Sequence, residues 1–422
     1  MPESPSRSLG AVLPSGGRDV LPIEVEELRS IEDQLGVTAA SFGYREVRTP
    51  VLELADVLDR AQEGGLGRTF RLFDDDGRTV VLRPDLTIPI SRLIATRMAD
   101  EQGPLRVRYT APRFRRMEPG RPTPTEERQS GVELVGINGP ESDAEVIALL
   151  VKALRATGLV DVQVAIGDAE LGARVLDALA VPEAARRALT AAAADHNLVT
   201  WRRIVMGLGL APDASAFLTG FPGTRGDRSV LAPVRRLAPG AAGACDWLEA
   251  TLDLLDGYGV GNAVRIDFGV LRDWPYYSGV VFEAYASGES TPVAVGGRYD
   301  TLAARFGSSR PSVGFAVSLG VLHRALGTRG RFAVNVLRDG VVVAEGLREG
   351  LPSAEAIRAT GITAIAVPGG VPEAESTAAA QSWRFVASIR EGVVELTDRS
   401  SGRSDSGADV VAVLRGLLEG RK

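Results

Sequence analysis

The spacing of its strand-like segments constrains the fold of this chain more than any other feature. These short, partly alternating or β-branched runs are separated by hairpin-sized gaps or by long excursions. They lack the regular helical crossovers that successive parallel strands require. We therefore expect an α+β fold in which helices flank an antiparallel sheet. The predicted strands are Leu105–Tyr109, Gln129–Gly136, Val264–Gly269, Val280–Tyr285 and Ala316–Leu319.

The longest excursion interrupts the predicted sheet with a different composition. From about residue 165 to 260 the chain is rich in alanine and leucine, with helical patterns at Ala184–His196 and Ala244–Leu255. Amphipathic patterns of this length are typical of helices rather than strands. We expect a helical insertion between strands of one sheet, so residues 1–330 should form a single large domain.

A second, smaller domain is expected at residues 331–422. Short apolar strands at Val341–Ala344 and Ile362–Val367 alternate with helical patterns, which predicts a compact α/β unit of the usual size. Ser400–Ser406 has the low complexity of a loop. The region has no basic face, since Lys422 is its only lysine, so nothing in it indicates a tRNA-binding surface.

Composition excludes several kinds of site. The formal net charge is −6, whereas nucleic-acid binding usually needs a basic excess, which argues against tRNA as a partner. A single cysteine, Cys245, and two histidines, His196 and His323, argue against a disulfide and against a metal site. No apolar run is long enough to span a membrane, and no secretory signal is evident, so we expect a cytoplasmic protein without membrane contact.

Residues suited to binding a free amino acid are present in three segments. Such a ligand needs carboxylates for its ammonium group, a cation for its carboxylate and specific partners for its side chain. Each candidate also has an ordinary structural interpretation, such as a turn at Asp85 or a half-buried strand at Tyr276 and Tyr277. The candidates are Asp85, Thr87, Gln129, Glu133, Arg272, Tyr276 and Tyr277.

These segments follow one another in the order found in a known family. Together they resemble the active-site segments of histidyl-tRNA synthetases, over about residues 10–325, which implies a class II aminoacyl-tRNA synthetase-like fold. By this resemblance Asp85 and Thr87 match the amino-group segment, and Gln129 and Glu133 match the end of motif 2. Arg272, Tyr276 and Tyr277 match the histidine-specific segment. The matching runs are Arg83–Thr87, Phe114–Arg115, Gln129–Glu133, Arg272–Gly279, Gly296–Asp300 and Gly314–Ala316.

The ATP side of the same site departs from the family. Amino-acid adenylation needs cations at the phosphates, and the family supplies one arginine from motif 2 and another from motif 3. Arg115 matches the first, but Val321 stands where the second is expected. Loss of one preorganised charge typically costs roughly a hundredfold to a thousandfold in rate. We therefore expect a chain that is not itself an enzyme and has no cofactor, with Arg115 and Arg128 as candidate anion-binding residues.

A synthetase-like chain with an amino-acid pocket and a degraded ATP site resembles the regulatory subunits of ATP phosphoribosyltransferase, which serve the first step of histidine biosynthesis. That resemblance implies a short-form catalytic subunit as partner and L-histidine as effector. Phe42–Pro50 resembles motif 1, which implies a dimer through this region. A divergent histidyl-tRNA synthetase or another amino-acid-activating paralogue remains the alternative, because Pro275 interrupts the histidine-specific segment.

An arginine cluster admits two interpretations. It is dense for an acidic protein, and it could bind phosphate groups or an acidic partner. Equally, the arginines could pair with nearby glutamates on the surface of strands. The members are Arg106, Arg108, Arg113, Arg115, Arg116, Arg121 and Arg128.

Overall fold

A computed structural model describes residues 13–61, 69–117, 124–195, 197–270, 277–332, 338–344 and 347–419. The chain divides into two compact units, Met1–Arg331 and Phe332–Lys422. In the described part of the chain, no helix combines the length and apolar character needed to cross a bilayer.

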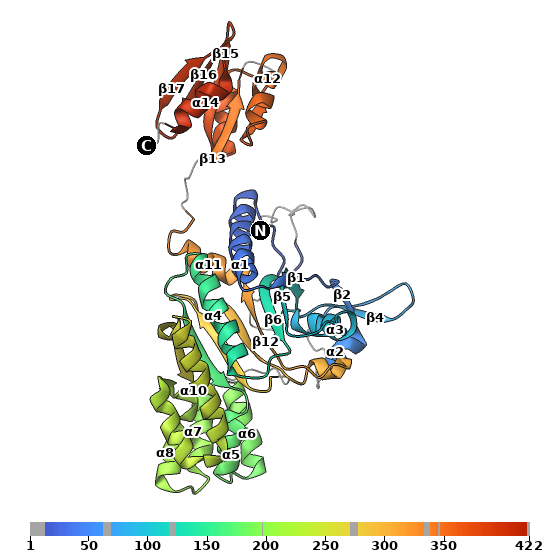
Figure 1. The fold of residues 1–422 in the computed structure, drawn as a ribbon, viewed down its shortest axis with the longest axis vertical. Coiled ribbons are helices and arrows are strands. Elements are labelled where there is room, and N and C mark those ends of the chain that lie inside the picture. The colour runs from blue at the N-terminus through green and yellow to red at the C-terminus, as the bar shows by residue number, and fades with distance from the viewer. Residues whose placement is uncertain are drawn as a thin grey trace, which may run out of the picture. The chain divides into compact units, whose positions relative to one another are not determined.

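A nine-stranded sheet organises the first unit (Figure 1). Neighbouring strands run antiparallel, except that β1 is parallel to β5 and β7 to β9, so the expected α+β class is confirmed. In spatial order the strands are β1 (Arg45–Glu46), β5 (Leu105–Phe114), β6 (Glu126–Val135), β12 (Ser312–Ser318), β11 (Ala294–Arg298), β10 (Val280–Tyr285), β7 (Gln163–Asp168), β9 (Val264–Asp267) and β8 (Arg225–Gly226).

Two central strands were not predicted from the sequence. β7 occupies the start of the stretch that we expected to be helical from about residue 165, so this part of that prediction is wrong. β11 contains Gly296 and Gly297, and glycine weakens the strand signal because it has no side chain to pack. Each strand has a neighbour on both sides that satisfies its backbone hydrogen-bonding groups. β11 lies between two antiparallel strands, β10 and β12. β7 lies between the antiparallel β10 and the parallel β9.

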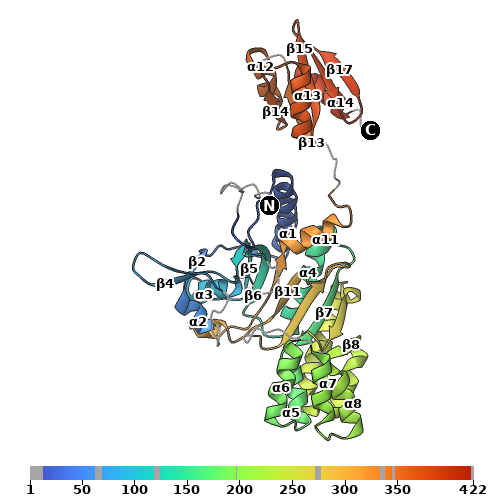
Figure 2. The ribbon, with the colours of Figure 1, turned by 180° about the vertical axis from the view of Figure 1, so that it is seen from behind.

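One face of the sheet is covered by long helices. α4 (Pro140–Ala156) lies in front of the strands in Figure 1 and behind them in Figure 2, with α1 (Pro22–Ser41) and α10 (Ala242–Gly257) packed against it. α4 is apolar on most sides, and Val146, Ile147, Leu149 and Leu150 are fully buried, which explains its central position. α11 (Leu319–Gly327) follows β12 directly and packs against α1.

The opposite face carries the helix that matters for the site. α3 (Thr87–Arg97) packs Ile90 and Ile94 against side chains of β5 and β6 on this face. It follows a three-stranded antiparallel sheet with the order β2-β4-β3, next to α2 (Ala55–Ala61). These strands are β2 (Leu52–Leu54), β3 (Arg71–Phe73) and β4 (Thr79–Leu82).

The helical insertion leaves the sheet after β7 and returns to it at β8. The helices expected at Ala184–His196 and Ala244–Leu255 correspond to α6 and α10, although His196 lies outside the described residues. The insertion comprises α5 (Leu171–Ala178), α6 (Glu183–Ala194), α7 (Leu198–Met206), α8 (Pro212–Gly220) and, beyond β8, α9 (Leu231–Leu237).

The second unit is a five-stranded sheet with helices. β14, β13 and β15 are parallel, and β15, β16 and β17 are antiparallel. The loop expected at Ser400–Ser406 is wrong, because Arg403–Gly407 forms the edge strand β17; its side chains are almost all exposed, so no apolar alternation marks it. The elements are β13 (Arg338–Val343), α12 (Leu347–Arg358), β14 (Thr363–Ala366), α13 (Val371–Ala380), β15 (Trp383–Arg390), β16 (Val393–Asp398), β17 and α14 (Val410–Glu419).

Candidate functional site

Asp85 is held in place by its neighbours on both sides. The buried guanidinium of Arg83 donates to the carbonyl oxygens of Thr49 at 2.7 Å and Pro112 at 2.9 Å, which fixes the turn between β4 and α3. Asp85 Oδ1 then accepts from the backbone N–H of Ile88 at 2.9 Å, as a carboxylate does at the start of a helix. The other oxygen, Oδ2, is buried and has no partner among the described residues.

Glu133 lies on β6, on the same side of the sheet as α3, and is only 1% exposed. The hydroxyl of Tyr299 donates to its Oε2. Its Oε1 is buried without a hydrogen-bond partner within the described ranges. Among the described residues, Asp85 and Glu133 therefore each leave one carboxylate oxygen without a partner, and buried polar atoms are rarely left so.

Glycines in the neighbouring strands make room for these side chains. A Cβ at Gly314 would lie 1.6 Å from Glu133 Oε2, and one at Gly131 would lie 2.4 Å from the hydroxyl oxygen of Tyr109. Gly314 pairs directly with Glu133, and Gly131 with Tyr109, so in both cases the side chain lies across a bare backbone position. Because glycine has no side chain, these two positions let a ligand or a neighbouring side chain approach the backbone of the sheet closely.

Burial controls the protonation of this site. Loss of solvent raises the pKa of Glu133 to about 8, while hydrogen bonds from Tyr299 and Thr87 act in the opposite direction and the charge of Asp85 raises it further. Burial also raises the pKa of Asp85, although Arg115 and Arg113 partly offset this. A cationic group that entered between the two carboxylates would satisfy both free oxygens and favour their ionised forms.

The structure brings five of the seven predicted pocket residues to this face. Gln129 is buried on β6 and faces the same side as Glu133, about 13 Å along the strand at roughly 3.3 Å per residue, a separation that suits an amino acid. Thr87 begins α3 beside Asp85. Arg272 and Tyr276 lie outside the described residues, and Tyr277 is half-buried with its ring against Gly297.

Two tyrosines of this face were missing from the sequence-based set. Tyr109 extends across Gly131 toward the Phe315 carbonyl oxygen, 3.4 Å away. Burial raises the pKa of Tyr109, and the charges of Glu133 and Asp85 raise it further. Tyr299 belongs to the run Gly296–Asp300 that matches the family, but its contact with Glu133 depends on strand register. The alternation along β5 could have indicated Tyr109 only once its pairing with Gly131 was known.

A buried ion-pair network holds Tyr299 in position. The preceding residue, Arg298, donates to Asp143 Oδ1 on α4 at 2.8 Å and to the carbonyl oxygen of Gly139 at 3.1 Å. The indole Nε1 of Trp247 on α10 donates to Asp143 Oδ2 at 2.6 Å. The end of β11 is thus tied to α4 and α10, which fixes where the Tyr299 hydroxyl meets Glu133.

On the ATP side, the two candidate anion-binding arginines contact other groups of the described chain. Arg128 makes two hydrogen bonds to Glu32 of α1, and Arg115 Nε donates to the Pro84 carbonyl oxygen at 2.9 Å. Val321 lies half-buried in the first turn of α11, where its backbone N–H donates to the N-cap Ser318 at 3.4 Å. Anion binding at Arg115 and Arg128 stays a prediction.

Most of the arginine cluster is paired with carboxylates. Arg106 pairs with Glu145 at 2.6 Å and Arg108 with Glu46 at 3.2 Å, while Arg113 pairs with Glu127 and Arg128 with Glu32. For these four residues the structure agrees with the interpretation that the arginines pair with nearby glutamates. Arg121 lies outside the described residues.

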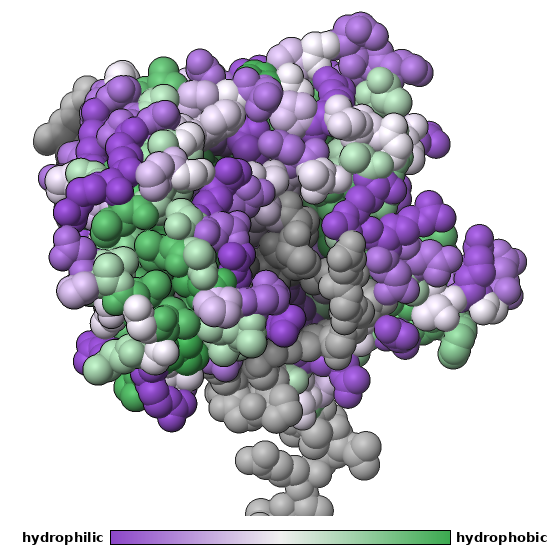
Figure 3. All heavy atoms as spheres, turned by 90° about the horizontal axis from the view of Figure 1, so that it is seen from below, coloured by the Kyte–Doolittle hydropathy of each residue, from purple (hydrophilic) through white to green (hydrophobic). Residues whose placement is uncertain are grey.

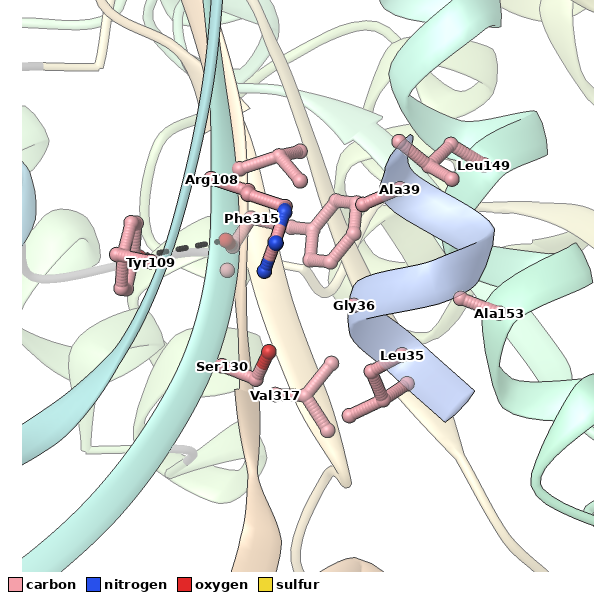
Figure 4. A pocket seen from close by; sticks show the side chains of 12 residues that line it. Leu35, Gly36, Ala39, Arg108, Tyr109, Ser130, Leu149, Ala153, Phe315 and Val317 are labelled. Carbon is pink, nitrogen blue, oxygen red and sulfur yellow. Dashed lines mark hydrogen bonds between the residues drawn. The ribbon is translucent and has the colours of Figure 1, made fainter. Parts of the chain in front are cut away.

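A small pocket lies on the other face of the sheet, between α1, α4 and the strands (Figure 4). Arg108, Val132 and Phe315 are paired across neighbouring strands, and their side chains lie on the face of the sheet opposite to that of Glu133. Apart from Arg108 and Ser130 its polar lining is slight, so it belongs to helix–sheet packing rather than to the amino-acid site. Among the described residues no group of three or more His, Cys, Asp or Glu side chains could hold a metal ion.

Comparison with known proteins agrees with this architecture. The family model for histidyl-tRNA synthetase matches residues 16–322. An ATP phosphoribosyltransferase regulatory subunit of Moorella thermoacetica is 36% identical, over 88% of this chain and 96% of its own length. One from Rubrobacter xylanophilus is 38% identical, over 92% of this chain and 93% of its own length.

Solved structures show the same fold. A Bacillus halodurans protein described as an ATP phosphoribosyltransferase regulatory subunit/histidyl-tRNA synthetase aligns with a TM-score of 0.79 and 28% identity, covering 91% of this chain and 99% of the other. A histidyl-tRNA synthetase from Nostoc sp. PCC 7120 aligns with a TM-score of 0.81 at 20% identity, covering 97% and 99%. The second comparison supports the fold alone.

Proposed function

Because the chain belongs to the regulatory subunits of ATP phosphoribosyltransferase, within the histidyl-tRNA synthetase family, we propose that it senses histidine for a short-form catalytic subunit. In this proposal the catalytic subunit needs the chain for full activity, and bound L-histidine reverses that activation. The assembly would control the first step of histidine biosynthesis, in the cytoplasm.

The pair of half-satisfied carboxylates carries this proposal. Asp85 Oδ2 and Glu133 Oε1 are buried and lack partners among the described residues, which is costly unless a ligand supplies donors. Free histidine offers two donor groups, an ammonium and an imidazole, and both can be cationic. We propose that Asp85 and Thr87 hold the ammonium group while Glu133 meets the imidazole, with Gln129, Tyr277, Arg272 and Tyr276 completing the pocket.

The ATP side supports a non-catalytic role. Adenylation would require positive charge at the phosphates, yet Arg128 is engaged by Glu32, and Val321 supplies no charge. A site that binds a ligand without catalysing a reaction can still shift an assembly equilibrium. A coupling free energy of roughly 1–3 kcal/mol between ligand binding and assembly is sufficient.

A dimer through Phe42–Pro50 is part of the proposal. This segment runs from the end of α1 through β1 at the edge of the sheet, where only β5 pairs with it. Val51, Leu52 and Leu54, which follow it, are exposed. An unpaired edge beside exposed apolar side chains is suited to a self-complementary interface.

The proposal is tested by phosphoribosyl-ATP formation. The catalytic subunit of the same organism is assayed alone and with increasing amounts of this chain. We expect activity to rise until the chain saturates its partner. A rate that does not depend on the chain, at concentrations that cover micromolar affinities, contradicts the proposed function.

A further inference from the structure

The helical insertion exposes an apolar surface at the end farthest from the sheet. α5 leaves the sheet and α8 returns to it, so the α5–α6 and α7–α8 connections both lie at this end (Figure 1). Figure 3, seen from below, shows an apolar area on the side of the insertion. The two connections contain no charged or polar side chain; they are Leu179-Ala180-Val181-Pro182 and Gly207-Leu208-Gly209-Leu210-Ala211. Val181 is buried, and the three leucines are half-buried, so these leucines present part of their side chains to solvent.

The outer face of α7 continues this surface. Positions 199, 202, 203 and 206 share one face by helical spacing, and Val199 is 81% and Met206 73% exposed. The opposite face of α7 is buried, and Trp201 Nε1 donates to the Leu218 carbonyl oxygen at 2.7 Å. The orientation of α7 is therefore fixed, and its apolar outer face is not left exposed by loose packing.

Two cations lie between Val199 and Met206 on the outer face of α7. Arg202 and Arg203 are exposed, and neither has an ion-pair partner in the part of the chain that the structure describes. Elsewhere in the insertion, exposed arginines pair with neighbouring acids, as Arg228 does with Asp256 at 2.7 Å. Unpaired arginines beside methionine and valine are typical of protein interfaces, in which methionine and arginine are enriched.

No predicted pocket residue lies on the insertion, so the ligand site does not account for this surface. Contiguous exposed apolar areas on a soluble domain usually mark a binding surface. The net charge of −6 and the uncharged connections favour a protein over a nucleic acid, whose phosphates would require a basic stripe.

We propose that the end of the insertion and the outer face of α7 form the docking surface for a partner protein that presents an apolar patch bordered by carboxylates. This inference rests on the proposed function, under which that partner is the catalytic subunit. Arg202 and Arg203 steer and orient the partner, and the apolar residues provide most of the affinity.

The test compares two double variants with a matched control. Val199→Glu/Met206→Glu introduces charge into the apolar face, and Arg202→Glu/Arg203→Glu reverses its border. Val160→Glu, which alters a valine that is 71% exposed in the connection between α4 and β7, is the control. Binding to the immobilised catalytic subunit is measured by interferometry, and histidine binding by calorimetry reports whether the pocket is intact.

We expect each double variant to bind the catalytic subunit at least tenfold more weakly, with histidine affinity unchanged and Val160→Glu equal to wild type. Wild-type-like binding by Val199→Glu/Met206→Glu overturns the docking surface alone. A wild-type chain that neither binds nor activates the catalytic subunit instead contradicts the proposed function, and with it the partner named here.

Two other occupants would also overturn the inference. If the double variants change the oligomeric state of the chain by itself, measured by light scattering, the surface joins copies of this chain. If wild type binds tRNA and Arg202→Glu/Arg203→Glu abolishes only that binding, the surface serves nucleic acid.

Discussion

The hydroxyl of Tyr299 donates a hydrogen bond to Glu133 Oε2, joining the residue after β11 to the C-terminal part of β6 across β12. The intervening strand has Gly314 at this position, so nothing separates the two side chains. Tyr299 satisfies one oxygen of a buried carboxylate and leaves the other available. The strand register therefore determines what the site can bind.

Gly314→Ala tests whether the pocket depends on this bare position. The added Cβ would meet Glu133 Oε2 at 1.6 Å and the Val132 carbonyl oxygen at 2.4 Å, so we expect loss of histidine binding and a destabilisation of about 1–3 kcal/mol. Calorimetry and urea unfolding measure the two effects. Gly320→Ala in α11, whose Cβ would meet nothing within 4 Å, should be neutral or slightly stabilising.

Histidine affinity should depend on pH through Glu133. Burial raises its pKa to about 8, so at neutral pH the empty site holds the protonated form. The imidazole that we place beside Glu133 has a free pKa of about 6.5, so it can take up the proton that Glu133 gives up. Between about pH 6.5 and 8 we therefore expect little net proton exchange and nearly constant affinity, which falls at lower pH, where both groups are protonated, and above pH 8, where neither is. Calorimetry in buffers with different ionisation enthalpies measures the exchange, and exchange of a full proton at pH 7 would contradict the assignment.

Arg298→Ala should destabilise the first unit strongly. Arg298 and Asp143 are both buried, and removal of one partner of a buried ion pair costs roughly 3–5 kcal/mol. Chemical unfolding measures the change. The control is Arg174→Ala, which removes an exposed pair with Glu170 and should cost no more than about 1 kcal/mol. Equal effects of the two substitutions would show that the network does not anchor β11.

The chain should show no histidine-dependent exchange of pyrophosphate into ATP. Val321→Arg should also remain at background, because Arg115, the cation at the motif 2 position, donates to the Pro84 carbonyl oxygen. An active histidyl-tRNA synthetase serves as the positive control. Exchange by the wild-type chain above background would instead favour the divergent synthetase.

The sequence was most informative where local pattern and tertiary structure agree. β10 was predicted with its observed bounds because Val280–Tyr285 is a short run of β-branched and aromatic residues, and the fold class was predicted from the spacing of such runs. β11 and β17 were missed because glycines and fully exposed polar residues carry no such pattern.

Site residues were predictable only in part, for a related reason. Asp85 and Glu133 stand out as carboxylates among apolar neighbours, and the structure places them together on one face. Tyr109 and Tyr299 look like ordinary core aromatics in the sequence. Their roles arise from pairing with Gly131 and Gly314, which is a property of strand register that no single segment encodes.

Histidine should act on the assembly through the two buried carboxylates, Asp85 and Glu133. The most direct measurement is phosphoribosyl-ATP formation by the catalytic subunit across a histidine titration, with wild-type chain and with Glu133→Gln. We predict activation by both chains, with inhibition by histidine shifted at least tenfold to higher concentration for Glu133→Gln. The same histidine inhibition with both chains would place the sensor elsewhere and contradict this account.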